Sequence, residues 1–112
     1  MTARTEDFRV EDGQLRRAVV PKRGQPYEHG CERETFVEVL HEIDRLGGAG
    51  FVYEQILDEL DAPASQVATA VAFLRERGCV VPQFKRKHRA ATGDVFLDGM
   101  TEFEALAAGE AQ

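Results

Sequence analysis

The chain has 112 residues, of which 43% are hydrophobic and 30% are charged, and its formal net charge is −6. This length is typical of one domain, and the composition excludes wholesale disorder. No stretch approaches the roughly 18 consecutive apolar residues that a membrane-spanning helix needs, so we expect a cytoplasmic protein that does not enter a membrane.

Residues 1–30 contain two short β-prone runs separated by Asp12-Gly13. Asp-Gly between such runs is a hairpin signal. Pro21 and further glycine and proline residues then break the chain. The sequence therefore leaves two alternatives open for this segment, an irregular arm or a hairpin, and it places the folded domain over residues 31–112.

Three helices are predicted by apolar residues that recur at spacings of three and four. The first covers residues 32–46 and ends at a pair of glycines, and the second covers residues 52–60. The third begins near Pro63, which suits the first turn of a helix, and runs to Arg77. Gly78 then provides a helix stop.

After the third helix the pattern changes from helical to β. Residues 79–85 and 94–97 are the two strand candidates, and the polar stretch 86–93 between them predicts a hairpin with a long tip. Pro82 lacks a backbone N–H group, which indicates that its strand has an unpaired edge. A short last helix is expected over residues 101–108.

We expect the helices to enclose one apolar core. Its central residues are predicted to be Phe36, Leu40, Ile43, Ile56, Leu60, Val67, Val71, Leu74, Val80 and Phe96. Phe73 falls on the flank of the third helix, beside the buried stripe. It is expected to pack against the N-terminal segment or against a second subunit.

Three helices followed by a β-hairpin is the order of a winged helix-turn-helix domain. A valine, apolar residues four and seven positions later, a glycine after eleven and an apolar strand residue two further on are present as Val67, Val71, Leu74, Gly78 and Val80. Here the sequence resembles the recognition helix of small bacterial winged-helix transcriptional regulators. The resemblance implies a mainly α fold with a small β-hairpin, in which a three-helix core carries a wing.

The charge is segregated along the chain. Two stretches without acids hold most of the basic residues, namely Arg16, Arg17, Lys22 and Arg23 in the first, and Lys85, Arg86, Lys87, His88 and Arg89 at the predicted hairpin tip. Such a basic side could contact several phosphates although the pI is near 5.0.

The resemblance implies that residues between the buried ones of the third helix face a DNA groove. They include Ser65, Gln66 and Thr69, of which only Gln66 suits a bidentate contact with a base. We therefore expect a protein that regulates transcription and binds double-stranded DNA largely through phosphates, using the hairpin cations together with Arg16 and Arg17. A homodimer would double these contacts. The alternative is a protein–protein interaction module that does not bind DNA.

Enzymatic motifs are absent from the sequence. It contains no nucleophile elbow, phosphate loop or His-Glu-x-x-His pair. Of the candidate metal ligands, only His29 and Cys31 are paired at short spacing, and the others, His41, Cys79 and His88, are scattered. We therefore expect no metal, no cofactor and no catalysis, and two cysteines that remain thiols in a reducing compartment.

Overall fold

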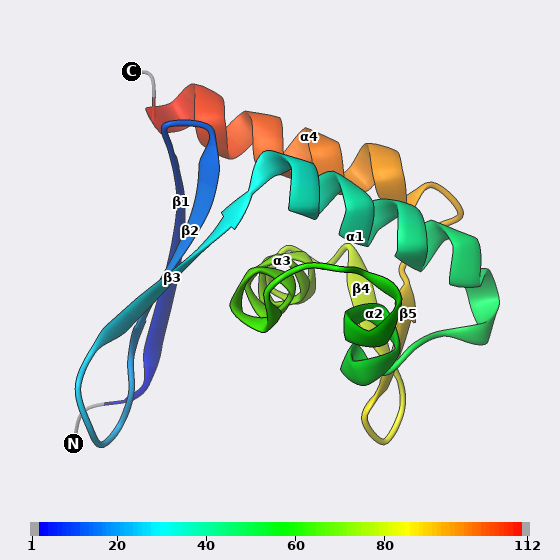
Figure 1. The fold of residues 1–112 in the computed structure, drawn as a ribbon, viewed down its shortest axis with the longest axis horizontal. Helices are drawn as coiled ribbons and strands as arrows, with labels where there is room; N and C mark the ends of the chain where they lie inside the picture. The colour runs from blue at the N-terminus through cyan, green and yellow to red at the C-terminus, as the bar shows by residue number, and fades with distance from the viewer. Residues whose placement is uncertain (1–2, 111–112) are drawn as a thin grey trace.

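The computed structural model describes residues 3–110 of the chain (Figure 1). In chain order the elements are β1 (Thr5–Glu11), β2 (Gln14–Val20), β3 (Tyr27–Glu32), α1 (Arg33–Leu46), the 3-10 turn η1 (Gly47–Ala49), α2 (Tyr53–Glu59), α3 (Ala64–Glu76), β4 (Val80–Phe84), β5 (Lys87–Ala90) and α4 (Val95–Glu110). No helix within this range is both long and apolar enough to cross a membrane.

The expected fold class, a mainly α winged helix-turn-helix with an irregular N-terminal arm, is wrong. The structure is a small α/β protein, 49% helical and 28% strand, in which a sheet of three strands precedes the helices. The Asp12-Gly13 signal does form a two-residue turn, because both residues adopt positive φ, 53° and 77°. The hairpin that it closes is then extended by β3.

The N-terminal sheet is an antiparallel meander with the order β1-β2-β3. Its register places Val10 opposite Leu15, and Leu15 opposite Cys31. All three side chains are buried on the face of the sheet that meets the helices. Alternate residues of one strand point to opposite faces, so this apolar set fixes which face turns inward.

The first three helices begin and end within about one residue of their expected bounds. Eight of the ten predicted core residues are buried, whereas Leu60 and Phe96 are only partly buried at the margin of the core. The prediction holds well here because a stripe of apolar residues on one face of a helix normally packs against the core.

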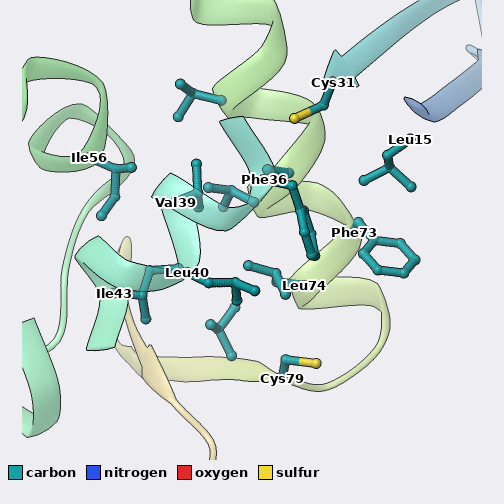
Figure 2. Close-up of a cluster of buried hydrophobic side chains, with 14 of the residues drawn as sticks. Leu15, Cys31, Phe36, Val39, Leu40, Ile43, Ile56, Phe73, Leu74 and Cys79 are labelled. Atoms are coloured by element: carbon teal, nitrogen blue, oxygen red, sulfur yellow. The ribbon is translucent and has the colours of Figure 1, made fainter. Parts of the chain in front are cut away.

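Phe73 is fully buried, and it joins the sheet to the helices. Its ring lies edge-on to Phe8 of β1 at 5.3 Å between centroids and to Phe36 of α1 at 5.8 Å. Figure 2 shows Phe36 and Phe73 together at the centre of the cluster, with Leu15 of β2 beside Phe73. Of the two expected partners for Phe73, the N-terminal segment is therefore the one observed.

The second hairpin differs from its prediction at the tip and in its second strand. Only Lys85-Arg86 separates β4 from β5, so half of the expected long tip, residues 87–90, is itself strand. The apolar run at residues 95–97 begins α4, whose first turn is preceded by a hydrogen bond from the Asp94 amide to the Thr92 hydroxyl. A short apolar run after glycine fits the start of a helix as well as a strand.

Strand β4 forms the outer edge of this hairpin. The inner strand β5 also pairs with Phe51, through hydrogen bonds of 2.7 and 2.8 Å between the backbones of Phe51 and His88. Pro82 lies on β4 opposite His88, whose backbone groups bond to Phe51 instead. The missing N–H group of Pro82 therefore costs no hydrogen bond between β4 and β5. This agrees with the edge position that proline indicated.

Helix α4 is longer than expected and lies along α1 and against β1 (Figure 1). Gly99 sits at the closest approach of the two helices. A Cβ atom built there would lie 2.5 Å from Leu40 Cδ2 and 2.9 Å from Leu40 Cδ1. Leu40 is fully buried and has little freedom to move aside.

We expect Gly99→Ala to lower the free energy of unfolding, measured by urea denaturation followed by circular dichroism. Overpacking costs about 1–3 kcal/mol, which exceeds the roughly 0.5–1 kcal/mol that alanine gains over glycine within a helix. Gly109→Ala is the matched control, because Gly109 lies on the same helix with nothing within 4 Å of its Cβ position. Equal stability of the two variants would contradict the close packing of α4 on α1.

Candidate nucleic-acid interface

The N-terminal sheet covers the flank of α3 that was expected to face DNA. Helix α3 packs between α1 on one side and strands β2 and β3 on the other. Thr69 is 0% exposed, and its hydroxyl donates a hydrogen bond to the Ser65 carbonyl at 2.8 Å. The Gln66 side-chain oxygen accepts a hydrogen bond from the Glu32 amide at 3.1 Å. Of the three expected contact residues on this helix, only Ser65 is exposed.

Arg16 and Arg17 are neighbours in sequence but lie on opposite faces of the sheet. Arg16 donates to Glu28 at 2.9 Å on the outer face, where Arg9 also donates to Glu28 at 2.8 Å. These two hydrogen bonds, from Arg16 first and then Arg9, lower the pKa of the Glu28 carboxyl below its usual value. Arg17 pairs with Glu6 at 2.6 Å on the inner face. Both expected phosphate contacts are therefore already neutralised by carboxylates of the same sheet.

The cations of the second hairpin are less constrained. Arg86 pairs with Glu54 of α2 at 2.7 Å, and its hydrogen bond lowers the pKa of that carboxyl. Lys85, Lys87 and Arg89 form no ion pair with any other residue that the structure describes. Lys85 and Arg89 are exposed, and Lys87 is half-buried beside them.

A second basic turn lies across the molecule from this hairpin. Lys22 and Arg23 occupy the connection between β2 and β3, and both are exposed. We call residues 20–27 the β2–β3 tip and residues 84–87 the β4–β5 tip. Figure 1 shows that the two tips project to the same side of the molecule, with α3 between them and with α1 and α4 on the far side.

The ion pairs separate the basic residues into two groups. Eight of the 14 lysines and arginines have a carboxylate partner within 4.0 Å. The remaining residues, which have no such partner among residues 3–110, are Lys22, Arg23, Arg75, Lys85, Lys87 and Arg89. Four of these lie at the two tips, and in the sequence Lys22 and Arg23 stand out only as part of a basic stretch.

A hollow of about 400 Å³ lies between the sheet and the second hairpin. Its walls include Arg17 of β2, Pro82 of β4 and His88 of β5, and Arg75 on α3 contributes to its floor. Arg75 and His88 also line a neighbouring hollow of about 470 Å³ beside α2. Arg75 therefore lines both hollows, and the acidic residues Glu6 and Glu76 also line the first of them.

Both cysteines are buried thiols. Burial raises the pKa of Cys31 to about 12 and the pKa of Cys79 to about 11, in each case chiefly because the thiolate would lose its hydration. No group of three histidine, cysteine, aspartate or glutamate side chains in the described range is arranged to hold a metal ion. We therefore assign no ligand role to either thiol.

Comparisons of the chain with protein-family models, with curated protein sequences and with solved structures found no match.

The raised thiol pKa values predict slow alkylation of the native protein. At pH 8 we expect Cys79 to react roughly 100-fold more slowly than in urea, because its thiolate fraction falls about tenfold for each unit that its pKa rises. Stability should also fall as pH rises from about 9 toward 11, because the unfolded chain releases the thiol proton first. Iodoacetamide labelling with mass spectrometry measures the rates, and equal native and denatured rates would refute the burial.

Proposed function

We propose that this protein binds double-stranded DNA through phosphate contacts made by its two basic tips. The observation that carries the proposal is the placement of four unpaired cations, Lys22, Arg23, Lys85 and Lys87, on one side of the molecule. An unpaired lysine or arginine keeps its full charge for a ligand, and each phosphate that it neutralises releases condensed counterions.

The distribution of charge permits this despite the net charge of −6. Eight of the 20 acidic residues lie on α1 and α4, on the side away from the tips (Figure 1), and most of the others lie on the N-terminal sheet and α2. Salt screens charges beyond roughly 10 Å, so a polyanion at the tips would mainly meet the local positive potential. Arg75, in the hollow between the tips, would add a further cation near the bound backbone.

The proposed binding has little sequence preference. Bases are read by side chains that enter a groove, whereas phosphate contacts carry no sequence information. With Thr69 buried and Gln66 bonded to Glu32, the exposed N-terminal part of α3 offers Ser65 and small apolar side chains. We therefore propose a general DNA-binding protein rather than a reader of one operator, and we propose that it acts in the cytoplasm.

A homodimer is part of this proposal, because four or five phosphate contacts provide only modest affinity at physiological salt. Two copies would double the number of contacts without any new contact type. Sedimentation of the free protein and of its complex with DNA tests this directly, since a monomer in both would exclude it.

Binding to another protein is the second candidate function. It is favoured by exposed apolar side chains at both tips, namely Val20 and Tyr27 at one and Phe84 at the other. Aromatic side chains that stand beside cations are common at protein interfaces. The partner would then need an acidic surface, and the protein would not bind DNA even at low salt.

The salt dependence of binding to a random-sequence duplex tests the DNA proposal. Between about 50 and 200 mM salt, we expect Lys22→Ala with Arg23→Ala to reduce the slope of log K against log salt by about two for each bound protomer, since each lost phosphate contact removes about 0.9. Lys85→Ala with Lys87→Ala should do the same, and the combined variant should lose about four. Fluorescence anisotropy of a labelled duplex provides the measurement.

The control for that experiment removes the same charge elsewhere. Arg9 and Arg33 are exposed but are paired with Glu28 and Glu104. Arg9→Ala with Arg33→Ala should therefore leave the slope close to that of the parent. If the tip variants behave like this control at every salt concentration, the tips do not contact phosphate. If the parent does not bind at low salt, the protein-binding function replaces this proposal.

A further inference from the structure

Among the large hydrophobic residues in the described range, Phe84 is the most exposed, with 68% of its surface accessible to solvent. It is the last residue of β4, it pairs with Lys87, and only Lys85-Arg86 lies between them. The ring therefore stands at the extremity of the β4–β5 tip. A single exposed phenylalanine is unremarkable, but its surroundings here are specific.

The hairpin that carries Phe84 is held at several points. The backbones of His88 and Phe51 exchange two hydrogen bonds, and the Gln83 side chain donates to the Gly48 carbonyl at 3.2 Å. Arg86 is tied to Glu54 of α2. These contacts come from η1, α2 and the segment between them, so the tip has a defined position from which the ring projects.

The charged side chains around the ring are basic, apart from Glu54 of α2, whose carboxylate is paired with Arg86. The Lys85 ammonium lies 5.4 Å from the centroid of Phe84, and Lys87 is its pairing partner on β5. Residues 77–93 contain no acidic side chain. A ligand that fits this tip must offer a flat apolar surface and dense negative charge at the same place. A DNA duplex has both, as stacked base pairs between two rows of phosphates.

We propose that Phe84 inserts between two base pairs of a bound duplex while Lys85 and Lys87 contact the phosphates that flank that step. This inference rests on the DNA-binding function proposed above and adds a contact with the bases. Insertion partly unstacks the step and bends the duplex. Steps that unstack most easily, such as TA, should therefore be favoured, so that the protein prefers deformable DNA without reading base edges.

The β2–β3 tip has a similar composition. Val20 and Tyr27 are each 41% exposed, and they stand on either side of the turn that holds Lys22 and Arg23. The Tyr27 ring lies 5.2 Å from the ring of His29, which leaves it less free to enter a base step than Phe84. The insertion is therefore assigned to Phe84 alone.

A single introduced tryptophan tests the insertion, because the chain has none of its own. In the variant Phe84→Trp, emission should be strongly quenched by a saturating duplex with a central TA step, and less by one of the same length with only G·C pairs. Leu97→Trp is the matched control, since Leu97 is 58% exposed on α4, and its emission should not change. Phe84→Ala should lose affinity for the TA duplex by roughly fivefold or more, as expected for an aromatic–base contact, with the parent's salt slope.

The outcomes separate this inference from the function on which it rests. If Phe84→Trp binds the duplex by anisotropy but its emission is unchanged, insertion is refuted and phosphate binding stands. If neither the parent nor the variant binds at low salt, both proposals fail. If single-stranded DNA of equal length quenches the emission more than the duplex does, insertion into a duplex is refuted. Unchanged affinity of a folded Phe84→Ala variant also refutes it.

Discussion

The packing of Phe8 against Phe73 is the contact on which the rest of the structure depends. It connects β1 to α3, and the rings of Phe36 and Phe103 continue the contact into α1 and α4 (Figure 2 for Phe36 and Phe73). Because aromatic side chains bury large areas, this chain of rings provides much of the apolar contact between sheet and helices. The sheet and the helices therefore share one core.

This packing decides which surface remains for a ligand. Three helices without the N-terminal sheet would leave this flank of α3 exposed to solvent, and Thr69 and Gln66 could then contact a ligand. Here the sheet occupies that flank, and the free cations lie instead at the ends of two β connections (Figure 1). The sheet also supplies Glu6 and Glu28, which neutralise Arg17 and Arg16. The sheet thus covers the surface of α3 that was expected to bind DNA, and it leaves the two tips exposed.

Much of the helical part follows from the sequence, because apolar residues at spacings of three and four predict both the bounds of a helix and its buried face. The sheet was less predictable. The strand Tyr27–Glu32 is largely polar, with Cys31 as its one buried residue, so it lacks the alternation that marks a strand. Nor could the sequence show that Arg16 meets Glu28, since that pair depends on the register between two strands.

Backbone amide shifts, measured by heteronuclear NMR during titration with a short duplex at low salt, test the central claim most directly. That claim is that a covered α3 leaves the two tips as the contact surface. We expect the largest shift changes at Lys22, Arg23, Lys85 and Lys87, and little change from Gln66 to Phe73. Changes concentrated on α3 would contradict it, because the sheet would then have to leave the helix before DNA could bind.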